Sequence, residues 1–354
     1  MRRFCFVTFI VIATLAIIAL AQQAPATGPY KVLKTAKVGG DGGFDYVYAD
    51  VDGRRLYVPR SGANPRVSVY NLDTQEPVGE IPKTGGHGAA VDPKSGHGFA
   101  SSKPVAMWDT KTLALIKTID VQGGPDGILF DNFNQRVWIF SHGAPNATII
   151  DTKDGSIVGT LDLGGAPEQA VTDGNGHMYV DLEDVDKIAV VDTKALKVTG
   201  TYALEGKGGG PAGLAFDVKN HVLFASCHEP ATMVILNSDT GKILATLPIG
   251  AGTDGATFNP NTLEAFSSNG DGTLTVIKEN SPTSFVVEQN VATMPRAKTL
   301  TMDTKTNHVL LIAAEYGPPP APPADAPKDA QKKGGRGPRA PMLPDSFSIV
   351  VVGK

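Results

Sequence analysis

The sequence predicts an all-β fold, and three observations support this prediction. Glycine and proline account for 40 and 26 of the 354 residues, above their average shares, as in chains with many tight turns. No long stretch shows the apolar spacing of a packed helix. Short β-branched and aromatic runs recur instead, separated by turn residues, with a period of about 40 residues.

Seven repeats align on a short inner strand that ends in Asp or Asn. We take the residue five positions before that Asp or Asn as the start of each repeat, and successive starts are 39 to 44 residues apart. A repeat of this length, with turn residues at each boundary, is typical of a β-propeller. The seven starts are Asp45, His87, Asp126, Glu168, Ala212, Asp254 and Lys298.

Each repeat contains four strand segments. Residues 213–217 exemplify the first segment, 137–140 the second, 190–193 the third and 157–161 the fourth, after which the repeat ends in glycine. Four short strands joined by tight turns form one antiparallel blade. The sequence therefore predicts a seven-bladed β-propeller.

The last repeat is one strand short. It offers strands near residues 300–302, 309–314 and 347–351 only. Residues 31–38 precede the first repeat and end in Gly39 and Gly40, as the other fourth strands end in glycine. We expect this N-terminal segment to complete the last blade. Residues 31–354 would then form one closed ring without an open sheet edge.

The N-terminus predicts export to the periplasm or the cell exterior. Residues 1–21 combine Arg2 and Arg3, an uncharged apolar run and a small-residue cleavage site at Ala21, as in a signal peptide. An uncleaved anchor is the alternative, since the apolar run is near the lower limit for a membrane span. After cleavage we expect no membrane span, and residues 22–30 serve as a linker to the ring.

Charge and cysteine content limit the partners. Loss of the two arginines takes the net charge from −4 to −6, which argues against nucleic acid as a partner. Only Cys227 then remains, so the fold has no internal disulfide and depends on burial and strand pairing. We expect a monomer that binds a small molecule or a protein.

Residues 317–345 depart from the repeat pattern. They contain nine prolines and several charged residues, a composition that does not build a core. We interpret them as a surface loop inserted in the last blade. A tolerated insertion and a partner-binding arm or lid are both consistent with this composition.

Several short segments carry a resemblance to a known family. They are residues 56–59 (LYVP), 178–181 (MYVD), 150–152 (IDT) and 191–193 (VDT). With this spacing, residues 31–354 resemble the YVTN-type seven-bladed β-propellers of exported and surface proteins. The resemblance implies the fold. It implies little about function, because the family's relatives include binding modules, surface proteins, lactonases and quinoprotein dehydrogenases.

The geometry of a propeller predicts where a site would lie. Serine-hydrolase, zinc-protease, haem-attachment and P-loop motifs are all absent. The first residue of each inner strand should line one mouth of the central channel, and six of the seven starts can ionise. The loops after the second strands should reach the same mouth. They contribute Arg60, Lys103, His142, Glu183, His228, Asn269 and Glu315.

Opposite charges are adjacent around part of this ring. Lys298 lies between two carboxylates, and His87 lies between Asp45 and Asp126, which should favour its charged form. Asp126 and Glu168 are adjacent with no cation expected between them, so they should bind a cation or raise one carboxyl pKa. The candidate ligand-binding residues are Asp45, His87, Asp126, Glu168, Asp254, Lys298 and Arg60. The candidate metal ligands are Asp126, Glu168, His142, Glu183 and His228.

Two functions stay open. The first is an exported scaffold that binds a ligand or a protein, with its site at this mouth; the second is a metal-assisted hydrolase of the lactonase kind that uses the same mouth. A solvated polar ring without a ligand is the simpler interpretation of the same residues. No cofactor is indicated beyond a divalent cation. The sequence does not decide whether the protein is an enzyme.

Overall fold

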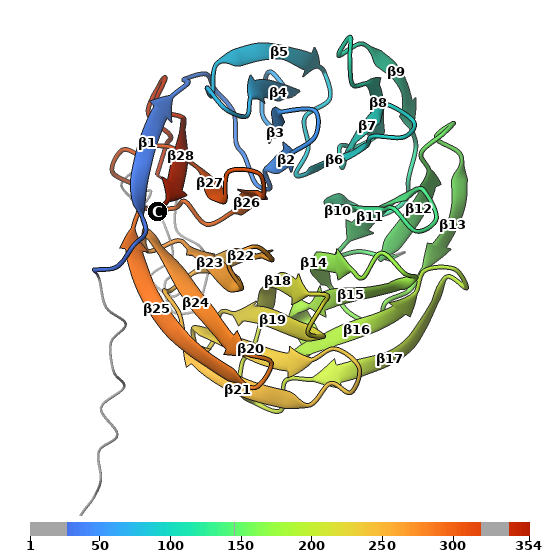
Figure 1. The fold of residues 1–354 in the computed structure, drawn as a ribbon. Coiled ribbons are helices and arrows are strands. Elements are labelled where there is room, and N and C mark those ends of the chain that lie inside the picture. Colours follow the sequence, from blue (N-terminus) through green and yellow to red (C-terminus); the bar gives the residue numbers. More distant parts are fainter. Residues whose placement is uncertain (1–26, 145, 320–339) are drawn as a thin grey trace, which may run out of the picture.

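Seven four-stranded antiparallel sheets form a ring, which confirms the predicted all-β, seven-bladed fold (Figure 1). The computed structural model describes residues 27–144, 146–319 and 340–354. The predicted signal peptide lies outside these residues. No helix in the described ranges has both the length and the apolar character needed to cross a membrane.

Blades 1 to 4 follow the chain in order. Each begins with its innermost strand and ends with its outermost. Blade 1 contains β2 (Tyr48–Asp50), β3 (Arg55–Arg60), β4 (Arg66–Asn71) and β5 (Pro77–Pro82). Blade 2 contains β6 (Ala89–Asp92), β7 (His97–Ala100), β8 (Val105–Asp109) and β9 (Leu115–Ile119). Blade 3 contains β10 (Pro125–Asp131), β11 (Arg136–Ser141), β12 (Ala147–Asp151) and β13 (Ile157–Leu161). Blade 4 contains β14 (Pro167–Thr172), β15 (His177–Leu182), β16 (Lys187–Asp192) and β17 (Lys197–Ala203).

Blades 5 and 6 repeat this arrangement, and blade 7 takes one strand from the N-terminus. A short 3₁₀ helix, η1 (Glu183–Val185), follows β15 in blade 4. Blade 5 contains β18 (Pro211–Asp217), β19 (Val222–Cys227), β20 (Thr232–Asn237) and β21 (Ile243–Pro248). Blade 6 contains β22 (Thr253–Asn259), β23 (Glu264–Asn269), β24 (Thr273–Ser281) and β25 (Ser284–Ala292). Blade 7 contains β26 (Leu300–Asp303), β27 (His308–Ala313), β28 (Ser348–Gly353) and β1 (Lys31–Lys37).

The N-terminal strand closes the ring as predicted. β1 pairs antiparallel with β28, from Lys31 opposite Gly353 to Lys37 opposite Ser348. Tyr30, just before this strand, is held by blade 6: its N–H donates to Gln289 Oε1 at 3.0 Å, and Gln289 Nε2 donates to its carbonyl at 2.8 Å. The end of the predicted linker is therefore part of the fold.

The Asp or Asn at the end of each inner strand stabilises the following turn. Its side-chain oxygen accepts a hydrogen bond from the N–H two residues later in six blades, for example Lys94 to Asp92 at 2.8 Å. In blade 1 the acceptor is Asp50 and the donor is Gly53, at 2.9 Å. These Asx turns explain why the repeat alignment depends on Asp and Asn, whose short polar side chains mimic a turn of backbone.

The core lies between neighbouring blades. Side chains from the inner faces of two sheets meet there, as Leu56 of blade 1 packs in one cluster with Ile312 and Ile349 of blade 7. Trp108 and Trp138 are fully buried. Truncation of such a residue to alanine typically costs about 3–5 kcal/mol. Cys227 is also fully buried, and burial raises the pKa of its thiol, as expected of a packing residue rather than a nucleophile.

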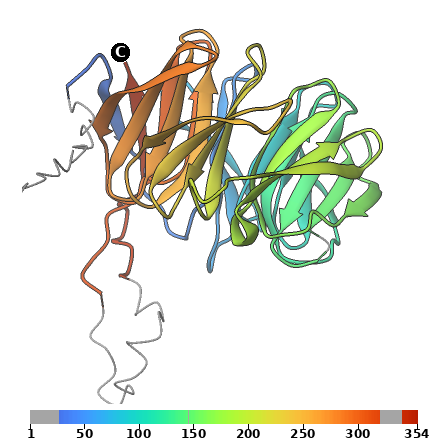
Figure 2. The same cartoon turned by 90° about the horizontal axis from the view of Figure 1, so that it is seen from below.

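The described ends of the Pro-rich insert pair with each other. Tyr316 and Met342 form an antiparallel bridge, Gly317 N–H donates to the Pro341 carbonyl at 2.9 Å, and Leu343 N–H donates to that of Glu315 at 2.8 Å. Tyr316 and Met342 also pack against the core between blades 7 and 1. Figure 2 shows the chain segments that flank the insert, coloured orange-red, leaving one face of the ring. The middle of the predicted insert, residues 320–339, lies outside the described ranges.

Candidate functional site

Local strand geometry places four of the seven repeat starts. In blades 3 to 6, the pairing of the two innermost strands shifts register at the start of the repeat. The shifted segment contains Asp126 in blade 3, Glu168 in blade 4 and Asp254 in blade 6. A β-bulge inserts an extra residue and redirects its side chain. These shifts recur at the same level of the ring and present the repeat starts to the channel mouth.

The ionisable starts form a continuous chain of contacts. Lys298 Nζ pairs with Asp254 and lies 3.7 Å from Asp45 Oδ1. His87 Nδ1 lies 2.8 Å from Asp45 Oδ2 and 3.3 Å from Asp126 Oδ1. Four opposite-charge pairs thus link blades 6, 7, 1, 2 and 3. The sequence predicted both the Lys298 and the His87 contacts.

His142 continues the chain into blade 4 and corrects one expectation. Its Nε2 lies 2.8 Å from Glu168 Oε1 and 3.7 Å from Asp126 Oδ2. The two carboxylates therefore do not face each other without a cation, because the loop after β11 inserts an imidazole between them. Glu183 in η1 then lies 3.8 Å from His228 Nε2 through its Oε1, which extends the chain to blade 5.

Two sets of three potential metal ligands lie within this chain. One is Asp45, His87 and Asp126; the other is His142, Glu168 and Glu183. Within each set, the ligand atoms all lie within 4.8 Å of one another. The predicted metal ligands are thus divided. Three of them form the second set, Asp126 belongs to the first, and His228 lies beyond Glu183.

Burial and hydrogen bonding shift the pKa values of these groups. The hydrogen bond to Glu168 raises the pKa of His142 to about 9, and the hydrogen bond to Asp45 raises the pKa of His87. Burial raises the pKa of Asp126 and of Asp254, the latter to about 6 despite Lys298 beside it. The mouth therefore favours the charged forms of His87 and His142 and disfavours ionisation of Asp126 and Asp254, a pattern common in binding and catalytic sites.

Two residues that the sequence analysis did not identify join blades through hydrogen bonds near the mouth. Tyr46 of blade 1 donates its hydroxyl proton to Glu168 Oε2 of blade 4 at 3.0 Å, across the ring. Gln169 accepts from the N–H groups of Leu214 and Ala256 at 3.1 and 3.0 Å and donates to the Ala256 carbonyl at 2.9 Å. Each directly follows a repeat start, so its position in the repeat was the available clue.

A cavity of about 790 Å³ opens beside the first ligand set. Asp45, His87 and Lys298 line one side of it, and Tyr316 and Met342 from the base of the insert line another. The guanidinium carbon of Arg296 lies 4.0 Å from the centre of the Tyr316 ring. This volume is within the usual range of small-molecule sites. The sequence analysis did not identify Arg296 or Tyr316.

Arg60 does not reach the mouth with the other candidates. It is fully buried, with its guanidinium 3.8 Å from the centre of the Phe347 ring and one N–H donated to the Gly42 carbonyl at 3.0 Å. The strand pairings show that Ser61, not Arg60, is equivalent to His142. Alternate residues of a strand point to opposite faces, so a shift of one position turns Arg60 away from the opening. Asn269 is buried for the same reason.

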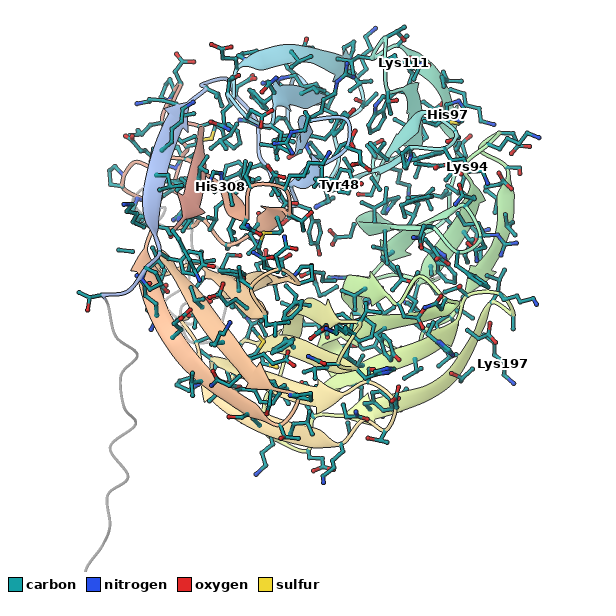
Figure 3. All side chains as sticks on the ribbon, in the orientation of Figure 1. Tyr48, Lys94, His97, Lys111, Lys197 and His308 are labelled. Carbon is teal, nitrogen blue, oxygen red and sulfur yellow. The ribbon has the colours of Figure 1, made fainter. Side chains whose placement is uncertain are left out.

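The remaining histidines lie away from this mouth, as expected for turns at the other end of the inner strands. His97 and His308 appear over blades 2 and 7, outside the channel (Figure 3). His97 Nδ1 lies 2.7 Å from the Thr152 carbonyl of the neighbouring blade.

Comparisons with known proteins support the fold. No family model matches the chain, and no curated protein matches it in sequence. Solved structures share the architecture at low identity, and three of them serve as examples. A chain of the mitotic checkpoint complex has a TM-score of 0.66 at 12% identity, over 88% of this chain and 95% of that one. The RRP9 WD40 repeats have a TM-score of 0.67 at 12% identity, over 94% and 99%. The U3-55K structure has a TM-score of 0.67 at 10% identity, over 92% and 99%.

The mouth offers a defined chemistry. It contains both imidazoles and carboxylates. A charged imidazole must lose a proton before its nitrogen can bind a metal, whereas an ionised carboxylate binds a metal directly. Zinc and similar ions accept this mixture of nitrogen and oxygen ligands. A set of three protein ligands leaves coordination positions for water or a ligand.

Proposed function

We propose that this protein is an exported, YVTN-type propeller that binds a ligand at the mouth defined by the two ligand sets, and that a divalent cation held by His142, Glu168 and Glu183 takes part in that binding. One observation carries the proposal. Ligand atoms from three loops or strands of blades 3 and 4 converge within 4.8 Å. The cavity of about 790 Å³ lies at the same mouth, beside the first ligand set, and has room for a small molecule.

Proton competition should govern the affinity for the cation. His142 has to lose its proton before Nε2 can bind a metal, and its pKa is about 9. Below that pH, each unit should weaken zinc binding by about tenfold through this one group. The neighbouring carboxylates Glu168 and Glu183 offset part of this cost, because a dication interacts with them more strongly than an imidazolium does.

Calorimetric titration with zinc chloride and with calcium chloride tests the proposal. Wild-type protein should bind zinc, and Glu168→Gln should bind it at least about tenfold more weakly, since it loses a charged ligand. Asp52→Asn is the matched control, because its carboxylate is exposed and, among the described residues, pairs with surface Lys305 alone, 3.1 Å away. Absence of cation binding, or equal binding by wild type and Glu168→Gln, would contradict the proposal.

A lactonase-like hydrolase is the second candidate, and the His142–Glu168 pair favours it. A cation in the second ligand set would polarise the ester carbonyl and lower the pKa of a bound water. Asp126 or Glu168 would accept a proton from that water as its oxygen attacks the carbonyl carbon. The ring C–O bond then breaks, and the alkoxide takes up the proton, so that a hydroxy acid is released.

A pH-stat assay with γ- and δ-lactones separates the two candidates. The enzyme should release acid from a lactone, and Glu168→Gln should lose this activity while Asp52→Asn keeps it. Cation binding without turnover of any lactone leaves the binding scaffold as the function. A scaffold of this kind can also bind a protein at the same face. The solved structures share too little sequence identity with this chain to identify such a partner.

A further inference from the structure

A second cavity lies between blades 4 and 5, at the ends of the strands remote from the mouth. It has a volume of about 580 Å³. Asp173 and His177 line it, from the turn between β14 and β15, the two strands whose opposite ends lead to Glu168 and Glu183. His221 and Asp239 line it from turns of blade 5. The cavity is therefore separate from the candidate site described above.

Aromatic rings form one wall of this cavity. Tyr179 and Tyr202 stack with their centres 6.4 Å apart and an interplanar angle of 27°. Phe216 meets Tyr179 edge to face, at 5.3 Å and 73°. The Tyr202 hydroxyl donates to the Ser238 carbonyl at 2.7 Å, which fixes this half-buried ring against blade 5. Tyr179 is 5% exposed and contacts both Tyr202 and Phe216.

The charged groups around the wall are carboxylates paired with imidazoles. His177 Nδ1 lies 2.8 Å from Asp173 Oδ2, and His221 Nδ1 lies 2.9 Å from Asp239 Oδ1. Among the described residues that line the cavity, none is lysine or arginine. Asp173 also accepts the backbone N–H groups of Asn175 and His177, at 2.7 and 2.9 Å. Asp239 is the more exposed carboxylate and the one more accessible to a ligand.

This geometry does not favour a metal ion. The described residues that come together as three potential metal ligands are the two sets at the mouth, and neither set includes a group from this cavity. Aromatic faces beside carboxylates instead suit an organic cation, because the ring quadrupole and the carboxylate both attract positive charge. A methylated ammonium is the best match, since it loses little hydration on contact with the rings.

We propose that the cavity between blades 4 and 5 binds a small quaternary ammonium compound, with the cation against Tyr202 and Phe216 and within the field of Asp239. The proposal does not depend on the function of the mouth. Titration with choline tests it, and 3,3-dimethyl-1-butanol, which has nearly the same shape without the charge, is the matched ligand control. Choline should bind, and the neutral compound should bind at least about tenfold more weakly.

Three variants locate the binding. Tyr202→Leu and Asp239→Asn should each weaken choline binding several-fold, whereas Tyr202→Phe, which keeps the ring, should stay within about twofold of wild type. Glu168→Gln at the mouth should bind choline as wild type does. The proposal fails if choline does not bind at millimolar concentration, or if the neutral compound binds equally well. It also fails if Glu168→Gln loses choline binding while Tyr202→Leu keeps it.

Discussion

The imidazole of His142 lies between the carboxylates of Asp126 and Glu168, with its Nε2 2.8 Å from Glu168 Oε1 and 3.7 Å from Asp126 Oδ2. This relationship joins the two ligand sets into one chain of contacts. It also explains how blades 3 and 4 place two acidic side chains at one mouth, since an interposed cation reduces their repulsion.

Glu168→Gln should lower the pKa of His142 from about 9 toward the ordinary value for histidine, because the hydrogen bond from His142 to Glu168 is the largest cause of the shift. The raised pKa also implies a stability effect. The His142–Glu168 pair contributes fully to the free energy of unfolding below about pH 6.5, and this contribution is lost as the pH rises through about 9. Imidazole NMR titration measures the pKa. If both proteins give the same value, the contact with Glu168 does not set it.

Asp181→Asn should stabilise the protein at neutral pH. Asp181 is fully buried, and both of its carboxyl oxygens lack a hydrogen-bond partner among the described residues. Burial raises its pKa well above the usual value. Ser101 and Ser268 occupy the equivalent positions in blades 2 and 6 and donate to the carbonyls of Asp126 and Lys298, the starts of the next blades. A neutral amide removes the cost of keeping an acid buried, about 1–3 kcal/mol.

Urea unfolding as a function of pH measures this effect. The advantage of Asp181→Asn should be large at pH 7 and should disappear near pH 4, where the carboxyl is protonated in the unfolded chain as well. Asp52→Asn at the surface is the control. Asp92→Asn is unsuitable because Asp92 stabilises a turn. A loss of stability at neutral pH in Asp181→Asn would mean that the charged form has a partner outside the described residues.

Deletion of residues 22–40 should unfold or aggregate the whole ring, because it removes β1 and exposes the edge of β28. A milder variant, Gln289→Ala, loses the two hydrogen bonds to the Tyr30 backbone and should cost about 1–3 kcal/mol. Thermal unfolding measures both. Native melting of the deletion variant would contradict closure by the N-terminal strand.

Replacement of residues 320–339 by a short Gly-Ser turn should change the melting temperature by only a few degrees, since their composition does not supply a core. Replacement of all of 317–345 should cost more, because Met342 packs against the core between blades 7 and 1. If the shorter replacement is the more damaging one, the central part of the insert contacts the ring.

Much of the fold was predictable because the sequence repeat follows the strands and turns of each blade. The Asx turns hold an Asp or Asn at the same point of every blade, so the sequence aligns on them, and the missing strand of the last blade pointed to residues 31–38. The site was less predictable. Arg60 was assigned one position from its true equivalent, and one position in a strand exchanges the two faces. Contacts across the channel, such as Tyr46 with Glu168, depend on ring geometry that no local pattern contains.

The imidazole nitrogen NMR spectrum of His142, recorded at pH 7 with and without one equivalent of zinc, tests the central proposal most directly. Without zinc, His142 should be doubly protonated, because its pKa is about 9. With zinc, Nε2 should lose its proton and take the shift of a metal-bound nitrogen, and Glu168→Gln should not show this metal-bound shift. If His142 stays doubly protonated in the presence of zinc, the second ligand set does not hold a cation and the proposed site is contradicted.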